Sequence, residues 1–295
     1  MGVDGLLLVD KPKGPTSQTV VTKVRRALGT DKAGHTGTLD PFATGLLLVC
    51  LGRATKLAQW LTGEEKRYRA DVALGASTDT DDRTGKELSR ADASRVDRAA
   101  LEAALAAFRG KISQVPPAFS AIQKDGERMY DKARKGEAVE IEPRDVTVHE
   151  LVLESFTPGA IATAVISLRV SKGTYIRSIA RDLGRALGVG GHLTELRRTA
   201  SGAYAIDGAI ALDAVEKSPA DAIARLVPVD RVVLPMPDLA VTADEAKKLE
   251  NGIVPRDAAA RDGGADGLRR LVAPDGRALA VAALAAGRIT LERVL

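Results

Sequence analysis

The sequence has few of the residues that build disulfide scaffolds or metal centres. Its 295 residues include one cysteine and three histidines. Cys50 therefore cannot form an internal disulfide, and its place in the apolar run 46–51 indicates a small buried side chain in a reducing compartment. Because the histidines lie far apart along the chain, we expect no structural zinc site. Aromatic residues make up only 3% of the chain, so a tyrosine among basic residues is more informative than usual.

Long apolar runs and glycine-rich phosphate loops are missing as well. No run approaches the length that spans a membrane. The short apolar segment 5–9 is followed at once by Asp10 and Lys11, which is unlike a signal peptide. No GxGxxG or GxxxxGKS/T sequence opens a helix, which removes the main support for a nucleotide cofactor. We therefore expect a cytoplasmic protein with no membrane association, no metal and no cofactor.

The length and charge of the chain permit several domains and a nucleic-acid partner. The formal net charge of +4 allows a polyanionic partner without requiring one. The hydrophobic content of 45% and the charged content of 28% are ordinary for a globular protein. The pattern of predicted elements changes near residue 233, to a short helix and small strands, which predicts domains at 1–232 and 233–295.

The apolar patterns predict an α+β fold with a mixed, largely antiparallel sheet flanked by helices, because strands and helices alternate without a regular βαβ rhythm. A helix should begin at Thr16 or Ser17 and end at Gly29. Segment 78–95 is charged without an apolar period and should be a surface loop, and 126–135 should be a basic helix. Further helices are expected at 54–61, 99–108, 174–187, 212–226 and 243–250, and strands at 5–10, 46–51, 66–74, 146–156, 161–170 and within 193–206.

Asp40 lies in the most informative segment, the glycine- and threonine-rich turn GHTGTLDPFATG at 34–45. The apolar run 46–51 follows directly and should be buried. A carboxylate at the entrance to a core strand is well placed to act on a ligand. Asp before Pro also initiates turns, so turn formation alone is the alternative role of Asp40.

Four further segments accompany this turn. They are DKPKG at 10–14, KRYR at 66–69, SKGTYIRSIARDLG at 171–184 and HLTELRRT at 192–199. Together with the Asp40 turn, and in order through residues 5–210, they resemble the bacterial tRNA pseudouridine-55 synthases of the TruB family. The resemblance implies the pseudouridine-synthase fold and, at 233–295, a small, mostly-β, PUA-like RNA-binding domain.

The resemblance also implies a reaction and three catalytic residues. The reaction is isomerisation of uridine-55 in the TΨC loop of tRNA, on a base flipped out of its stack, with Asp40 as the essential carboxylate. Arg177 matches the arginine that pairs with this aspartate and would favour its ionised form; a solvated or phosphate-binding arginine at a helix start is the alternative. Tyr68 matches the tyrosine that stacks on the target base, and a half-buried tyrosine on a sheet is the alternative. Attack by Asp40 on C1′, attack on C6 and formation of a glycal all remain open.

Six substrate-binding residues follow from the same resemblance. His35 matches the histidine that helps to extrude the nucleotide, Tyr175 and Leu196 match pocket walls, and Lys11, Lys124 and Arg197 are expected to contact phosphates. Taken singly, the histidine would be structural, the pocket walls would be core residues, and the basic groups would form a solvated face. The run 128–135 resembles a mobile segment that clasps RNA.

Two other classes of protein share parts of this pattern. One is an RNA-binding or RNA-folding module that has kept the fold and lost the reaction, against which the set Asp40, Tyr68 and Arg177 argues. The other comprises the archaeal and eukaryotic relatives that work inside guide-RNA particles, which the poorly matching tail disfavours. A hydrolase is disfavoured because no serine or cysteine nucleophile motif is present. We expect a monomer with no obligatory protein partner that binds tRNA through its TΨC arm.

Overall fold

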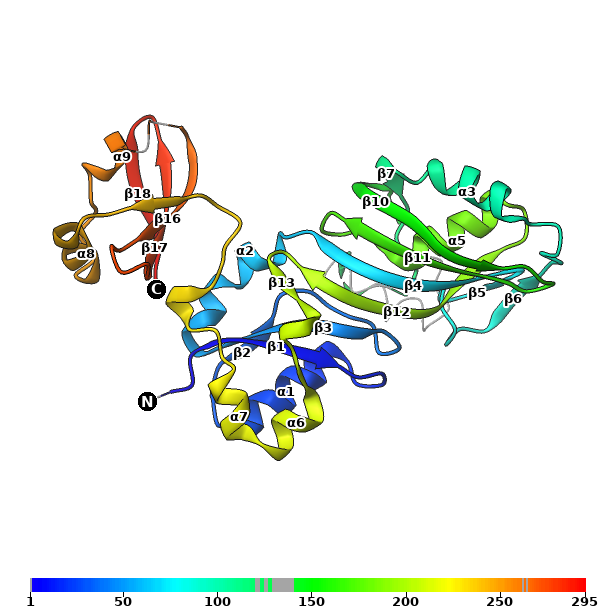
Figure 1. Cartoon of the computed structure of the whole chain (residues 1–295), viewed down its shortest axis with the longest axis horizontal. Coiled ribbons are helices and arrows are strands. Elements are labelled where there is room, and N and C mark those ends of the chain that lie inside the picture. Colours follow the sequence, from blue (N-terminus) through cyan, green and yellow to red (C-terminus); the bar gives the residue numbers. More distant parts are fainter. Residues whose placement is uncertain (1, 120–122, 125–126, 129–140, 262, 264) are drawn as a thin grey trace. The chain divides into compact units, whose positions relative to one another are not determined.

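The computed structural model describes residues 2–119, 123–124, 127–128, 141–261, 263 and 265–295 (Figure 1). The chain forms two compact units. The first comprises Met1–Pro41, Gly45–Glu64 and Gly202–Leu295, and the second comprises Phe42–Thr44 and Glu65–Ser201. Within the described residues, no helix is both long enough and apolar enough to cross a membrane.

The first unit is built around two strands that are buried on both faces. β1 (Gly5–Lys11) pairs antiparallel with β3 (Thr44–Leu51) over its whole length. Side chains alternate between the two faces of a strand. Leu7 therefore enters one core cluster and Leu6 enters another. Burial on both faces explains why these strands read as continuous apolar runs in the sequence.

Three helices contribute to the cluster that contains Leu7 (Figure 1). They are α1 (Ser17–Ala27), α6 (Leu212–Lys217) and α7 (Pro219–Ala224). The single helix predicted at 212–226 is wrong: α6 ends before Ser218 and α7 begins at Pro219. Proline lacks an N–H and disfavours helical backbone at the residue before it, so the helix breaks there.

The cluster that contains Leu6 is completed by short helical segments. The 3-10 helix η1 (Gly52–Leu57), the helix α2 (Ala58–Thr62) and the 3-10 helix η3 (Val229–Arg231) contribute to it. Two short strands extend this sheet: β2 (Ala33–His35) pairs with β3, and β14 (Ile210–Ala211) pairs parallel with β1. The remaining short elements are β13 (Tyr204–Ala205) and the 3-10 helix η2 (Ile206–Gly208).

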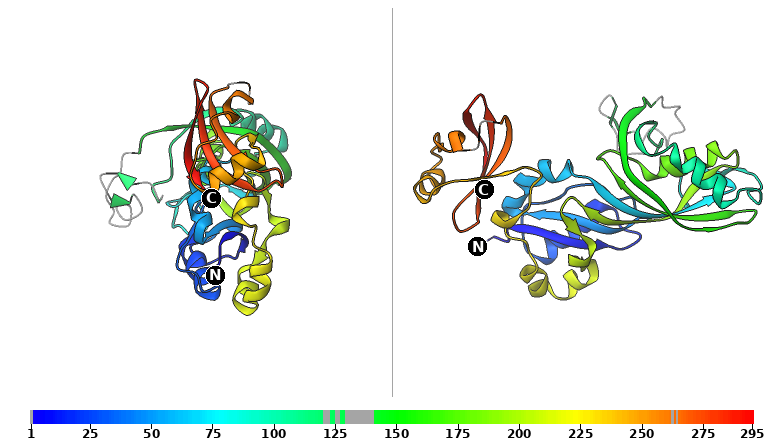
Figure 2. Two further views of the ribbon diagram at one scale, coloured as in Figure 1. Left: turned by 90° about the vertical axis from the view of Figure 1, so that its left-hand side faces the viewer. Right: turned by 45° about the horizontal axis from the view of Figure 1, so that its top comes forward.

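The C-terminal part of the first unit is a small sheet with two helices on it (Figure 2). Its strand order is β15 (Asp238–Ala240), β16 (Gly267–Val272), β17 (Ala278–Ala285) and β18 (Arg288–Val294). Side chains of α8 (Ala243–Glu250) and α9 (Ala258–Arg261) share a core cluster with this sheet. The mostly-β character expected after residue 233 is confirmed.

The second unit is an antiparallel sheet with strand order β12-β4-β11-β10-β7. Helix α5 packs on β4 and β12 and contacts α3. The pattern of antiparallel strands interspersed with helices confirms the predicted α+β class. The bounds of these elements are β4 (Lys66–Leu74), α3 (Arg98–Ala106), β7 (Gly110–Gln114), β10 (Arg144–Thr157), β11 (Ala162–Val170), α5 (Ile176–Ala186) and β12 (Gly191–Ser201).

The predicted surface loop at 78–95 is wrong in two respects. β5 (Ala76–Thr78) and β6 (Glu87–Arg90) form a short antiparallel pair. The turn between them carries Asp81 and Asp82, which are only 8% and 4% exposed. The charged residues of this turn are therefore not all exposed to solvent, because the buried Arg177 and the half-buried Arg181 of α5 contact Asp82 and Asp81.

The basic helix predicted at 126–135 lies largely outside the described residues, as does the expected clasping segment 128–135. Of this region the structure describes the backbone of β8 (Gln123–Lys124) and β9 (Glu127–Arg128), which pair antiparallel. Lys124 lies in β8, and its side chain is outside the described part of the chain.

Candidate active site

Asp40 lies in the first unit, on the connection between β2 and β3. It is half-buried, and the turn continues through Pro41 and Phe42 into β3. The run 46–51 behind it is fully buried, with no side chain more than 1% exposed. The predicted position of Asp40, a carboxylate on a turn at the entrance to a core strand, is confirmed.

Lys11 supports this turn from the end of β1. Its side chain is 0% exposed, and its Nζ donates to the carbonyl oxygens of Pro12 at 3.0 Å and Pro41 at 3.3 Å. A fully buried ammonium group does not reach a phosphate on the surface, so the structure does not support the phosphate contact expected from the sequence. The solvated alternative is also wrong. Lys11 instead contacts the backbone beside Asp40.

His35 ends β2, five residues before Asp40. Its Nδ1 accepts a hydrogen bond from the backbone N–H of Gly37 at 3.3 Å. In a neutral imidazole an acceptor nitrogen carries no proton, so this bond corresponds to the tautomer with the proton on Nε2. The ring is half-buried.

Tyr68 lies in the second unit on β4, between two strands. It pairs with Leu168 of β11 on one side and with Arg198 of β12 on the other. Leu196 pairs with Ala70, two residues further along β4. Residues opposite each other in an antiparallel pair point to the same face, so these side chains share one face of the sheet. Tyr68 is half-buried and Leu196 is 7% exposed, which places an aromatic ring beside a leucine on that face.

Arg197 points to the other face of β12 from Leu196, since neighbouring side chains on a strand alternate. It is half-buried, and one guanidinium nitrogen lies 3.5 Å from the hydroxyl of Thr44. The solvated alternative therefore applies to Arg197 only in part. Arg198, the next residue of the same motif, is 2% exposed and shares the face of Tyr68.

Arg177 lies in the first turn of α5 and is buried, with 4% exposure. Its guanidinium donates to the carbonyl oxygens of Thr80 and Phe119, both at 2.9 Å, and lies 3.8 Å from the carboxylate of Asp82. The alternative of a solvated arginine at a helix start is therefore wrong. Two fixed carbonyl acceptors and one carboxylate hold the planar guanidinium in one orientation.

Tyr175 precedes α5 and is held by a buried side-chain amide. Gln114 of β7 is 2% exposed; its Oε1 accepts from the N–H of Tyr175 at 2.8 Å and its Nε2 donates to the carbonyl of Tyr175 at 3.1 Å. The Tyr175 ring is half-buried and stacks with the guanidinium of Arg144, 5.3 Å from the ring centroid. The helix that carries Arg177 is therefore anchored at its start by a pair of hydrogen bonds.

Sequence reasoning missed the turn at 79–85, which meets α5 from the other side. Asp82 accepts hydrogen bonds from the Thr84 N–H at 2.8 Å, the Thr84 hydroxyl at 2.6 Å and the Thr80 hydroxyl at 3.0 Å. Asp81 adopts a left-handed backbone (φ 60°) and pairs with Arg181 of α5 at 3.0 Å. Burial raises the pKa of Asp81, and the nearby Arg181 and Arg177 oppose that rise. The alternation of Thr and Asp in this segment is the signal for such a self-bonded turn.

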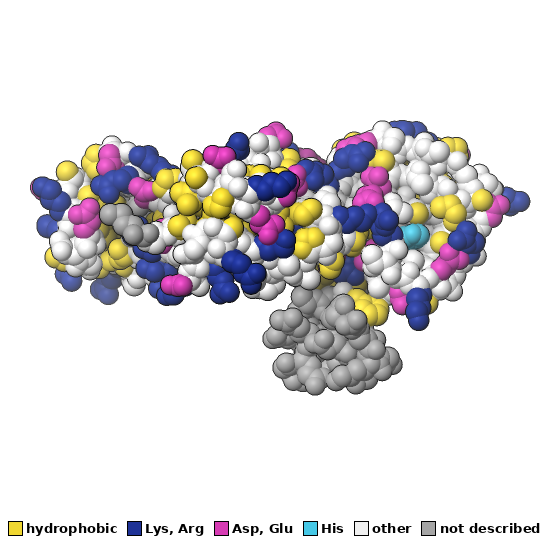
Figure 3. Space-filling model, turned by 90° about the horizontal axis from the view of Figure 1, so that it is seen from below, with side chains coloured by type: hydrophobic (Ala, Val, Ile, Leu, Met, Phe, Trp, Pro, Cys, Tyr) yellow, Lys and Arg dark blue, Asp and Glu magenta, His cyan; other side chains and the backbone are white. Residues whose placement is uncertain are grey.

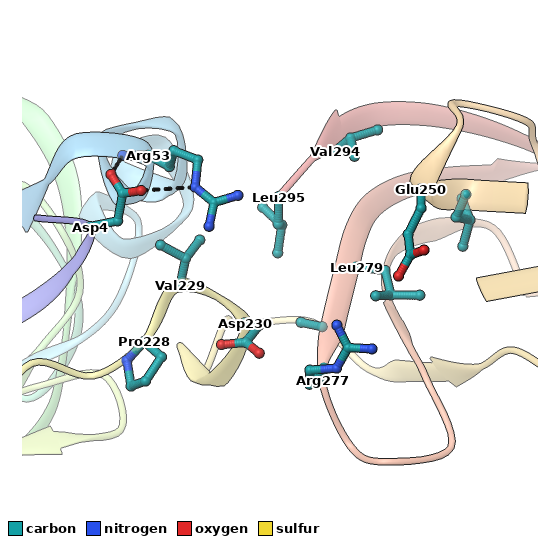
Figure 4. A pocket seen from close by; sticks show the side chains of 12 residues that line it. Asp4, Arg53, Pro228, Val229, Asp230, Glu250, Arg277, Leu279, Val294 and Leu295 are labelled. Carbon is teal, nitrogen blue, oxygen red and sulfur yellow. Dashed lines mark hydrogen bonds and ion pairs between the residues drawn. The ribbon is translucent and has the colours of Figure 1, made fainter. Parts of the chain in front are cut away.

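A pocket of about 360 Å³ lies in the first unit (Figure 4). Its walls include the Asp4–Arg53 ion pair and the side chains of Glu250 and Arg277. None of the residues predicted for the site lines it. No group of three or more His, Cys, Asp or Glu among the described residues could hold a metal ion.

Family models match most of the chain. Residues 25–176 match the N-terminal domain of the TruB family of pseudouridylate synthases. Residues 177–242 match the C-terminal domain of tRNA pseudouridylate synthase B. The matched ranges contain eight of the nine residues predicted for the site, all except Lys11.

Similar proteins agree with these matches. The chain is 47% identical to tRNA pseudouridine synthase B of Symbiobacterium thermophilum over an alignment of 253 residues. This alignment covers 86% of this chain and 83% of the relative. It is 45% identical over 291 residues to the protein of the same name from Thermobifida fusca, covering 95% and 94%. A chain in a crystal structure of a Cbf5-Nop10-Gar1 complex has a TM-score of 0.71 and 25% identity, covering 99% of this chain and 85% of that chain. The expected family resemblance is confirmed: this chain belongs to the TruB family of pseudouridylate synthases.

Proposed function

We propose that this chain is an isomerase that converts uridine-55 in the TΨC loop of tRNA to pseudouridine. The observation that carries the proposal is the 45% to 47% identity to proteins named tRNA pseudouridine synthase B, over 86% or more of this chain. The retained motif residues Asp40, Tyr68 and Arg177 favour an active enzyme over an RNA-binding module that has lost the reaction.

The reaction needs a carboxylate but no redox partner. The N1–C1′ bond breaks, the uracil turns, and a C5–C1′ bond forms; C5 gives up its proton and N1 gains one, so atoms and electrons balance. We assign the essential carboxylate to Asp40, acting as a nucleophile or as a stabiliser of positive charge on the ribose. Its position on a supported turn at the end of a buried strand is suited to either role.

The other residues are assigned roles in binding the flipped nucleotide and in pairing with the negative charge of Asp40. Arg177 is the partner cation of Asp40, an assignment that rests on the family motif. Tyr68 is the stacking surface for the flipped base, with Leu196 beside it as a wall, and stacking on an aromatic ring is worth about 1–3 kcal/mol per base. His35, as the neutral tautomer with a proton on Nε2, can donate to an RNA oxygen while the nucleotide leaves its stack.

Contacts with the tRNA backbone are assigned to exposed or half-buried basic residues. Lys and Arg side chains occur over much of the face in Figure 3, with Asp and Glu among them. Arg197, Lys124 and Tyr175 keep the binding roles that the motifs imply, and residues 233–295 are assigned to RNA binding. We further propose a cytoplasmic monomer with no obligatory protein partner. The similar Cbf5 chain is found in a complex with Nop10 and Gar1, so a protein partner is the alternative.

The proposal is tested by incubating the purified chain with an unmodified tRNA transcript and mapping any pseudouridine formed. We expect one modified position, uridine-55. A transcript with cytidine at that position is the matched control and should remain unmodified. Release of tritium from C5-labelled uridine measures turnover in the same reaction. Binding of tRNA without tritium release would instead favour the RNA-binding module, and modification at another position would contradict the assigned substrate site.

A further inference from the structure

We propose that Ser17 is a positioning residue for the proposed reaction, because its buried hydroxyl fixes the backbone that carries Asp40. Ser17 is the first residue of α1, and its side chain is 1% exposed. Its Oγ donates to the carbonyl oxygen of Leu39 at 3.1 Å and accepts from the N–H of Leu39 at 2.8 Å. One hydroxyl therefore satisfies both main-chain groups of the residue before Asp40.

These two bonds replace the pairing that a strand would provide. Leu39 is 3% exposed and lies outside β2 and β3, so its N–H and carbonyl have no ladder partner. Buried main-chain groups without a partner are costly, and Ser17 supplies the partner from a sequence distance of 22 residues. The carbonyl of Leu39 belongs to the peptide group that also contains the N–H of Asp40. Fixing this carbonyl therefore fixes the peptide plane on the N-terminal side of Asp40.

The peptide on the C-terminal side of Asp40 is restrained independently. The residue before a proline is confined to extended backbone, and Pro41 itself has a fixed φ. The carbonyl of Pro41 accepts from the Gly14 N–H at 2.8 Å and from Lys11 Nζ at 3.3 Å. Residues 11–17 thus hold the turn on both sides of Asp40, which sets the direction in which its side chain leaves the backbone.

Ser17 is itself held firmly. The hydroxyl of Thr16, the cap of α1, accepts from the Thr19 N–H at 3.0 Å, which leaves the Ser17 hydroxyl available for Leu39. Val20, Val21 and Val24 anchor the helix in the core with at most 2% exposure. Because α1 is rigidly packed, it provides a fixed point against which the turn can be aligned. Misplacement of a catalytic group by about 1 Å can cost on the order of 100-fold in rate.

The test compares Ser17→Ala with Ser17→Thr, which keeps the hydroxyl, and with Thr22→Ala. Thr22 lies on the same helix and is half-buried, and among the described residues its hydroxyl bonds only to the carbonyl of Gln18. For each variant the single-turnover rate of pseudouridine formation and the dissociation constant for tRNA are measured at a temperature where circular dichroism shows the protein folded. Exchange of the Leu39 amide hydrogen reports the local bonds without relying on activity.

For Ser17→Ala we expect a single-turnover rate at least about tenfold lower, tRNA affinity within about threefold of the native value, and faster exchange at Leu39. Ser17→Thr should recover most of the rate, and Thr22→Ala should behave like the native chain. A rate within twofold of native for Ser17→Ala would overturn the inference, as would an equal loss in Thr22→Ala or no recovery in Ser17→Thr. If Ser17→Ala does not fold, Ser17→Cys takes its place, with the same rate loss expected and a native rate overturning the inference.

This inference rests on the proposed function, and the two can fail separately. Native chain and Asp40→Asn are run in the same assay. If the native chain forms no pseudouridine, the proposed function fails, while Leu39 exchange still reports whether Ser17 holds the turn. If the native chain is active and Ser17→Ala equals it, only the role of Ser17 fails.

Discussion

Replacing Gly184 by alanine should destabilise the second unit and disturb both elements that carry site residues there. Gly184 lies in α5 where the helix passes the start of β12. A Cβ at this position would lie 2.1 Å from the nitrogen of Gly191, 2.2 Å from the carbonyl carbon of Gly190 and 2.4 Å from its oxygen. Ordinary contacts of a Cβ begin near 3.4 Å, so the two segments must separate by about 1.3 Å.

No side-chain rotation can relieve this clash, because all three atoms belong to the backbone. Overpacking of a core costs about 1–3 kcal/mol, and alanine regains up to about 1 kcal/mol through its helix propensity. Because the clash involves three backbone atoms, its cost lies at the upper end of that range, and we expect a net loss of about 2 kcal/mol in the free energy of unfolding. The displaced segments lead to Arg177 in α5 and to Leu196 in β12, so catalytic activity should fall as well.

Urea denaturation followed by circular dichroism measures this loss. Gly63→Ala is the matched control: Gly63 has an ordinary helical φ of −68°, and its Cβ would meet only the carbonyl oxygen of Trp60 at 3.4 Å. This control should lie within about 0.5 kcal/mol of the native chain. A Gly184→Ala protein as stable as the control would refute the close approach of α5 and β12 on which the expectation rests.

Three more predictions concern single side chains. Burial raises the pKa of Cys50 to about 12, so its thiol should resist iodoacetamide in the native protein at about pH 8. The thiol should react once guanidinium chloride unfolds the protein, and labelling of the native protein would contradict this expectation. Gln114→Ala removes both hydrogen bonds to Tyr175 and should lower the free energy of unfolding by about 2–3 kcal/mol, as measured by urea denaturation. An unchanged urea midpoint would show that these two bonds do not stabilise the protein. Tyr68→Ala should weaken turnover by the loss of stacking, about 1–3 kcal/mol, and retained activity in Tyr68→Phe would exclude obligatory proton transfer by the hydroxyl.

Local patterns in the sequence were sufficient for the regular elements. The alternation at 66–74 predicts β4, and the segment 243–250 predicts α8, both with the bounds that the structure has. These elements form where propensity and apolar period agree with the tertiary environment. The break at Pro219 shows the limit of the apolar period, because one residue without an N–H overrides it.

The supports of the candidate site could not be predicted, because they depend on partners distant in sequence. Asp81 is buried through an arginine 100 residues away, and Ser17 bonds to a backbone 22 residues away. A charged or hydroxyl side chain reads as exposed until its partner is known. For the same reason, the motif at Lys11 predicts a phosphate contact, whereas the structure buries the side chain beneath the turn. The motifs predict the catalytic candidates themselves, but a motif does not indicate which distant residues hold each candidate in place.

The most direct test of this account is the tritium-release assay with Asp40→Asn. Asparagine has nearly the same size as aspartate and differs mainly in lacking the negative charge, so the variant isolates the carboxylate. We predict that it binds unmodified tRNA with nearly native affinity and releases no tritium from C5 of the target uridine above background. Substantial turnover by Asp40→Asn would contradict the claim that this carboxylate performs the rearrangement.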